Sequence, residues 1–381
     1  MNKVSGVQLL CLILSQCFIV TSCSTTGSSG TEVVGPPPPP SDTTPLGQDN
    51  LDAGLLNRNT AETINKDLDN TVETVKGRNS SQPNRGIFFS LGMLELERTS
   101  ESGDERTGSD SDITNLVLGY DQSLSDTWVV GSLLDLSRRS ASATDNIEEP
   151  SFSSDSFSVY LFSSLTLKNS LEISAYGGLG SADVSSTRFT EAGTFEFSNI
   201  NTNMPSTLEV DQGEVQGNSD SSLLSAGLNV TRRTSLGARN QLILRAEVDF
   251  SRFTTDAFTE QGTTNSEFAI RESTRENLRW TLSGGISRTY TGSIGVFVPA
   301  ITLGFVRDDP EIDDIVGDLV SNPNSTAAFD PAPIDRSYGQ LDLDLVLVRP
   351  HGIQFFGNIN SNFSNRFEDS RGINIGARLE F

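Results

Sequence analysis

Residues 340–347 read QLDLDLVL, in which a leucine stands at every second position. Successive side chains of a β-strand point to opposite faces, so the leucines of this stretch share one face. Asp342 and Asp344 lie on the other face. One face is therefore apolar and the other carries carboxylates, which is typical of a strand that meets a different environment on each side.

The same alternation recurs in two other segments. In residues 242–250 apolar side chains alternate with charged ones, and in residues 373–381 they alternate with polar ones. In a soluble sheet the apolar face packs inward, whereas in a membrane barrel the apolar face meets lipid and the charges line the lumen. The charges expected to face a barrel lumen are Arg245, Glu247, Asp249, Asp342, Asp344 and Arg378.

The lengths of the strands and of their connections favour the membrane barrel. About twelve candidate strands of roughly ten or more residues lie within residues 86–381, whereas soluble strands typically have ~5 to 6 residues. Short turns fall near Ser125, Asn169, Gly237, Gly292 and His351. They alternate with long polar stretches at residues 98–111, 139–153, 184–220, 254–276 and 309–334. Outer-membrane barrels combine tight periplasmic turns with long external loops, so we expect an all-β, antiparallel transmembrane barrel of about twelve strands.

The N-terminus has the three parts of a secretory signal: Lys3, a largely apolar stretch over residues 7–20, and small residues before Cys23. Residues 20–23, VTSC, resemble the lipobox of bacterial lipoproteins. This resemblance implies a signal peptide over residues 1–22 and acylation of Cys23 by the lipoprotein maturation machinery. The alternative is an ordinary secretory signal followed by a cysteine. The resemblance to lipoproteins also implies that Ser24 directs the chain to the outer membrane.

Two segments separate Cys23 from the expected barrel. Residues 23–59 are rich in Ser, Thr and Pro, with five consecutive prolines at residues 36–40, and they predict a disordered tether. In residues 60–77 the apolar Ile64, Leu68, Val72 and Val75 recur at helical spacing. They predict a short amphipathic helix whose charged face suits either the periplasm or a pore lumen.

The chemistry of the whole chain argues against several functions. A formal net charge of −23 repels phosphate backbones, so we expect no nucleic-acid partner. The single histidine, His351, lies in an expected periplasmic turn, so a histidine-dependent catalytic site is not expected. Asp342 and Asp344 as an acid–base pair are the weaker alternative to ordinary lumen lining. We therefore expect neither enzyme activity nor a cofactor.

One acidic loop is a weak candidate for a calcium site. It gathers carboxylate oxygens, which Ca²⁺ prefers, but their spacing is not that of an EF-hand. A solvated acidic loop without metal is the favoured interpretation. The carboxylates concerned are Asp308, Asp309, Asp313 and Asp314.

Two groups of residues resemble the β-domain of autotransporters. The first is Gly119-Tyr120-Asp121, followed by Leu124-Ser125-Asp126 and Trp128-Val129-Val130-Gly131. The second resembles the C-terminal signal read by the barrel-assembly machinery, and its residues are Asn374, Gly376, Leu379 and Phe381. The resemblance covers residues 60–381 and implies a twelve-stranded outer-membrane barrel with a helix threaded through its pore.

The chain departs from this family in one respect, because autotransporters usually carry a passenger of hundreds of residues, and only residues 23–59 stand in that position here. The leading hypothesis is a lipid-anchored outer-membrane barrel that translocates or anchors its own short N-terminal segment and displays external loops. The tether lies either outside the cell or in the periplasm. The alternatives are a porin-like small-solute channel and an adhesin that acts through acidic loops. The expected partners are outer-membrane lipid, the barrel-assembly machinery and the lipoprotein maturation machinery.

Overall fold

The computed structural model describes residues 85–98, 109–143, 151–167, 170–190, 192–199, 204–329, 336–366 and 368–381. The signal peptide over residues 1–22, Cys23, the tether over residues 23–59 and the helix over residues 60–77 lie outside these ranges and stay predictions. Within the described ranges, no helix is long and apolar enough to cross a membrane.

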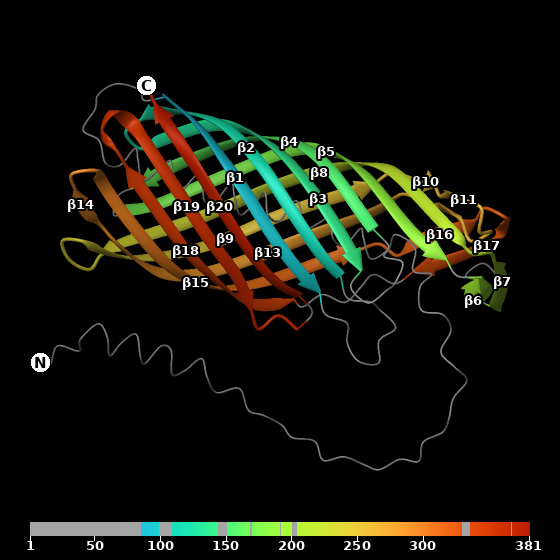
Figure 1. Cartoon of the computed structure of the whole chain (residues 1–381). Helices are drawn as coiled ribbons and strands as arrows, with labels where there is room; N and C mark the ends of the chain where they lie inside the picture. Colours follow the sequence, from blue (N-terminus) through green and yellow to red (C-terminus); the bar gives the residue numbers. More distant parts are fainter. Residues whose placement is uncertain are drawn as a thin grey trace, which may run out of the picture. The chain divides into compact units, whose positions relative to one another are not determined.

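Twelve strands pair in a closed antiparallel ring, which confirms the expected fold class. β1 pairs with β20 and β8 pairs with β9, so the ring has no open edge (Figure 1). A closed ring satisfies every backbone hydrogen bond of the wall, as lipid requires. The strands of the ring, in chain order, are β1 (Arg85–Arg98), β2 (Ser109–Ser125), β3 (Trp128–Ala143), β4 (Ser151–Leu167), β5 (Leu171–Thr190), β8 (Gly213–Ser235), β9 (Asn240–Thr255), β13 (Ser273–Arg288), β15 (Gly295–Ile312), β18 (Ser337–Val348), β19 (Ile353–Phe363) and β20 (Glu368–Glu380).

The outer surface of the ring carries an apolar belt. Every strand contributes a large apolar side chain that points away from the interior and is at least 40% exposed. Apolar side chains are stable in this position only when hydrocarbon surrounds them, so the belt is the lipid-facing surface. One such residue from each strand, from β1 to β20, is Leu91, Leu118, Leu136, Leu161, Leu179, Leu228, Leu244, Leu282, Leu303, Leu345, Ile359 and Ile375.

The strands continue beyond the belt at the end that carries the long connections. The expected loops at 98–111, 139–153, 184–220 and 254–276 are therefore too long, because strand residues occupy both flanks of each, and in the loop at 309–334 β15 occupies the N-terminal flank. In this part, which we call the external extension, the outward side chains are polar or charged, and the inward ones include buried apolar residues. Alternation of polar and apolar residues persists there with the faces exchanged. The inward apolar residues are Leu94, Leu96, Ile113, Phe152, Val184, Leu223 and Phe253.

Shorter strands complete the fold. β10 (Phe258–Thr259), β12 (Phe268–Ile270), β16 (Ile315–Leu319) and β17 (Asn322–Phe329) form a four-stranded sheet that we call the external sheet. Figure 1 shows it at the end of the barrel opposite the C-terminus and β14 (Tyr290–Gly292), which pairs with β15. β6 (Gly193–Asn199) and β7 (Met204–Val210) form a hairpin, and β11 (Gln261–Gly262) pairs with β8. A 3-10 turn, η2 (Pro350–Gly352), joins β18 to β19 and contains His351.

Aromatic rings inside the barrel pack flat against glycines of neighbouring strands. The ring of Phe88 on β1 covers Gly119 on β2, and the ring of Tyr160 on β4 covers Gly178 on β5. A Cβ atom at either glycine would overlap the ring, so these positions need glycine for close approach. This packing belongs to an apolar cluster on the inner wall of the first five strands, formed by Phe88, Val117, Val129, Leu133, Tyr160, Phe162 and Tyr176.

Candidate functional site: the barrel interior

The charged residues expected in the lumen lie on the inner wall, opposite the apolar belt. On β9, Arg245 and Glu247 form an ion pair of 3.6 Å, and the side chain of Asn229 donates a 3.1 Å hydrogen bond to Glu247. The hydroxyl of Tyr176 donates a 2.7 Å hydrogen bond to Asp249. Glu247 and Asp249 thus accept hydrogen bonds from other strands, and Arg245 pairs with Glu247 on its own strand, which offsets the cost of burying these charges.

Asp342 and Asp344 on β18 also face inward, while Leu343 between them is 43% exposed on the belt. Asn358 of β19 donates a 2.6 Å hydrogen bond to Asp344, and Gln340 donates a 3.4 Å hydrogen bond to Asp342. The two carboxylates thus have separate amide partners. This arrangement is that of wall lining rather than of a proton-sharing pair.

Arg378 closes the seam between the first and last strands of the ring. Its guanidinium passes from β20 over Gly86 of β1 and donates hydrogen bonds of 2.8 and 2.6 Å to the two carboxylate oxygens of Asp121 on β2. A further bond of 3.2 Å reaches Glu380. All three charged side chains are buried, and the bidentate geometry is the strong form of this pair. We call Arg378, Asp121 and Glu380 the seam cluster.

Sequence reasoning placed Arg378 in the lumen but missed Asp121 as its partner. The available signal was the Gly119-Tyr120-Asp121 motif, in which Asp121 is the inward residue between outward neighbours. It also missed Arg233, which is buried beside Glu172 at 2.6 Å. Arg233 follows Arg232 in the sequence, and only the strand register shows which of the two faces inward.

The four residues of the expected assembly signal divide between the two faces of β20. Asn374 and Gly376 face inward, and Leu379 and Phe381 are exposed on the outer side. The ring of Phe356 on β19 lies over Gly376, where a Cβ atom would overlap it. Close packing within the folded barrel therefore accounts for a glycine at this position. Recognition of the signal by the assembly machinery stays a prediction.

The candidate calcium ligands do not converge. Asp308 faces inward and accepts a 3.0 Å hydrogen bond from Asn277, whereas Asp309 faces outward and pairs with Arg336 at 3.6 Å. Asp313 accepts a 3.2 Å hydrogen bond from the backbone N–H of Thr274. In the described ranges no three His, Cys, Asp or Glu side chains gather in a way that could hold a metal ion.

Charged side chains and the apolar cluster of β1 to β5 share the inner wall of the barrel. A closed twelve-stranded ring with this lining, tight turns at one end and strands that continue beyond the belt at the other is the architecture of a bacterial outer-membrane β-barrel. The family model of the autotransporter β-domain matches residues 96–360. This chain belongs to the autotransporter β-domain family. The family assignment places the barrel in an outer membrane.

Solved autotransporter barrels have the same fold. The translocator domain of NalP from Neisseria meningitidis matches with a TM-score of 0.61 and 12% sequence identity, covering 89% of this chain and 100% of the other. The β-domain of the Bordetella autotransporter BrkA matches with a TM-score of 0.54 and 12% identity, covering 78% and 99% of the two chains. At this identity the likeness concerns the fold alone. No curated protein sequence matches this chain.

Proposed function

We propose that this autotransporter-family barrel translocates the N-terminal segment of its own chain and then anchors it at the outer membrane. The observation that carries the proposal is the interior wall, closed all round and lined by charges that already have partners. Because these charges are already paired, a segment that passes through the barrel does not need charges of its own to neutralise them. Residues 23–59 are mostly Ser, Thr, Gly and Pro, and their small side chains suit extended passage through a narrow polar lumen.

The lipid on Cys23 is part of the proposal. A single acyl anchor gives only marginal membrane binding, but here it would be combined with an integral barrel of the same chain. The tether would then be fixed at both ends, by lipid at Cys23 and by the barrel after residue 85. Metabolic labelling with a radioactive fatty acid tests this part, and Cys23→Ser is expected to abolish the label without removing the folded barrel from the membrane.

Translocation is tested with an epitope inserted after Gly47. If the segment crosses the barrel, antibody and protease reach the epitope in intact cells. The matched control is the same epitope in the turn at Gly237, between β8 and β9, which is expected to become accessible only after permeabilisation. An epitope at Gly47 that also needs permeabilisation contradicts translocation and leaves a barrel tethered in the periplasm.

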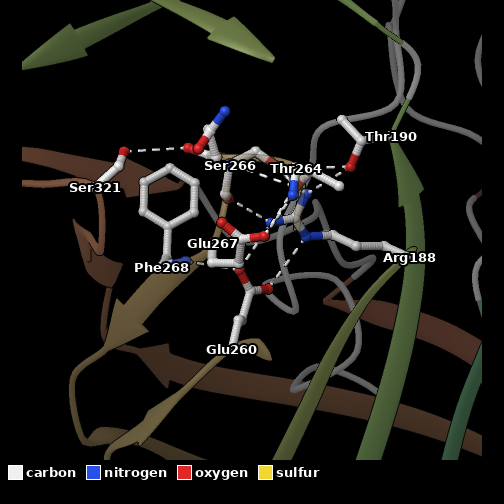
Figure 2. Close-up of polar contacts among 9 residues, drawn as sticks. Arg188, Thr190, Glu260, Thr264, Ser266, Glu267, Phe268 and Ser321 are labelled. Atoms are coloured by element: carbon white, nitrogen blue, oxygen red, sulfur yellow. Dashed lines mark hydrogen bonds and ion pairs between the residues drawn. The ribbon is translucent and has the colours of Figure 1, made fainter. Parts of the chain in front are cut away.

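A second function, display of a folded external surface, is supported by the external sheet. Its strands enclose an apolar core of their own, formed by Phe268, Ile270, Ile315, Leu319 and Ala327. Figure 2 shows the buried polar network beside it, in which Arg188 of β5 pairs with Glu260 at 2.7 Å. Ordered external elements of this kind suit adhesion. Adhesion is refuted if barrels lacking the external sheet bind cells or matrix as well as the intact protein.

The channel alternative rests on the polar lumen alone. Deleting residues 60–77 and recording single-channel conductance separates it from translocation, because a plug helix would block ion flow until it is removed. A substantial conductance in the intact protein favours the channel. We propose no enzymatic role, since none of the interior carboxylates described above forms a proton-sharing pair.

A further inference from the structure

The end of the barrel that carries the tight turns has exposed arginines. None of them forms an ion pair with a carboxylate among the residues that the structure describes. A cation without an internal partner at a membrane interface is available to an external anion. The residues are Arg85, Arg232, Arg239, Arg288 and Arg349.

Carboxylates at the same end are turned inward. Asp121 and Glu380 are buried against Arg378, and Glu172 is buried against Arg233. Among the described residues of the turns and adjacent strand ends, Asp126 is the one exposed carboxylate side chain. The outer surface of this end is therefore positively charged although the whole chain has a net charge of −23.

Arginines at the opposite, external boundary of the apolar belt differ from those at the turn end. Two outward arginines at the external boundary form ion pairs within the chain. Arg138 lies 3.8 Å from Asp155, and Arg252 lies 3.6 Å from Glu276. These two arginines are therefore less available to an external anion than the five at the turn end.

Arg239, in the turn between β8 and β9, and Arg288 on β13 lie beside an aromatic pair, and Arg232 lies on the neighbouring strand β8. The guanidinium of Arg288 lies 5.1 Å from the ring centre of Tyr290, and that ring lies 6.2 Å from the ring of Phe297. The N–H of Thr289 donates a 2.8 Å hydrogen bond to the carbonyl of Arg239, which holds the two strand ends together. We call Arg232, Arg239, Arg288 and Tyr290 the arginine patch.

The arginine patch directly adjoins the apolar belt. Ile286 precedes Arg288 by two residues on the same face and is 45% exposed, and Leu244 pairs in register with Arg232. Two strand residues span roughly 7 Å, so the cations stand where hydrocarbon gives way to headgroups. The exposed aromatic ring is also typical of this interface.

We propose that the arginine patch binds the phosphate groups of anionic phospholipids in the periplasmic leaflet, with their acyl chains against Ile286 and Leu244. Guanidinium groups match phosphate oxygens in charge and geometry, and the stacked ring orients one of them. The orientation in the membrane is that of the autotransporter family. The inference does not depend on which segment the barrel translocates.

The test compares the folded full-length protein with two triple variants in lipid discs that contain equal amounts of phosphatidylglycerol and phosphatidylethanolamine. The first variant is Arg232→Gln/Arg239→Gln/Arg288→Gln. The matched control, Arg138→Gln/Arg252→Gln/Arg336→Gln, removes the same charge from paired arginines at the external end of the barrel. Native mass spectrometry measures which lipids stay bound, and heat-modifiable migration in gels shows that all three proteins are folded.

Wild type and control are expected to retain phosphatidylglycerol in preference, by about fivefold for each engaged arginine before salt screening. The patch variant is expected to lose most of this preference. Equal retention of the two lipids by wild type overturns the proposal. An equal loss in both triple variants overturns it as well, because it would show an effect of net charge rather than of this patch.

Discussion

The apolar belt and the external extension are built from the same strands, yet their two faces have exchanged roles. On β1, Phe89 and Leu91 point outward within the belt, and four positions later Glu95 points outward while Leu94 and Leu96 are buried inside. The strand geometry is unchanged across this boundary. What changes is the surrounding medium, which is hydrocarbon around the belt and water around the extension. Apolar side chains therefore face outward in the belt and inward in the extension.

The largest expected loss of stability comes from removing a buried charge inside the belt. Arg378→Gln leaves Asp121 buried without its cation and is expected to destabilise the folded barrel by about 3 to 5 kcal/mol. Urea unfolding in liposomes measures it. Arg138→Gln, which breaks an exposed pair in the external extension, is the control and is expected to cost less than about 1 kcal/mol. Equal effects would mean that the seam cluster is no more important than a surface pair.

Adding a charge to the outer face of a strand tests where the apolar belt ends and the external extension begins. Leu161→Arg, in the middle of the belt on β4, is expected to cost about 2 to 4 kcal/mol because the arginine meets hydrocarbon. Ser153→Arg stands on the same face of the same strand but in the external extension, and it is expected to change the free energy of unfolding by less than about 0.5 kcal/mol. If both variants lose the same stability, the belt does not end where the polarity changes.

A third change tests whether the external sheet is a local unit beyond the barrel. Arg188→Gln removes the charged donor from the buried Glu260 and is expected to cost about 1.5 to 3 kcal/mol. Hydrogen exchange should show faster opening of residues 258–270 with unchanged protection of the belt strands. Arg271→Gln, at an exposed pair with Asp318, is the control with a smaller effect. Faster exchange throughout the barrel would show that the sheet and the belt unfold as one unit.

The smallest effect is a pH dependence confined to the external sheet. Hydrogen bonds from Thr326 and from Arg271 hold the pKa of Asp318 below its usual value. Because the folded pKa is lowered, the stabilisation is fully present above the pKa of the unfolded chain, about 3.9, and is lost as the pH falls through the folded value. A carboxyl NMR titration checks this, and Thr326→Val is expected to move the pKa upward. An unchanged titration in that variant contradicts the assigned cause.

The fold was predictable because a period of two over long strands, with turns that alternate in length, has few structural solutions. The strand ends were not predictable. In residues 139–153 and 184–220 most side chains are polar, and a mostly polar strand facing water has much the same composition as a loop. The apolar inner wall of β1 to β5 was missed for a related reason. In β4, residues such as Tyr160 and Leu161 are both apolar, so alternation cannot show which faces lipid.

The sequence by itself determined that this chain forms a closed antiparallel barrel with an apolar outer face, because the alternation of side chains along a strand is a local property. It also determined which of Asp342 and Leu343 faces the interior. Only the tertiary structure decided that Arg378 meets Asp121 across β1, that Arg188 meets Glu260, and that Arg232 faces outward while Arg233 is buried. These pairings depend on strand register and ring closure, which bring together residues up to 257 positions apart.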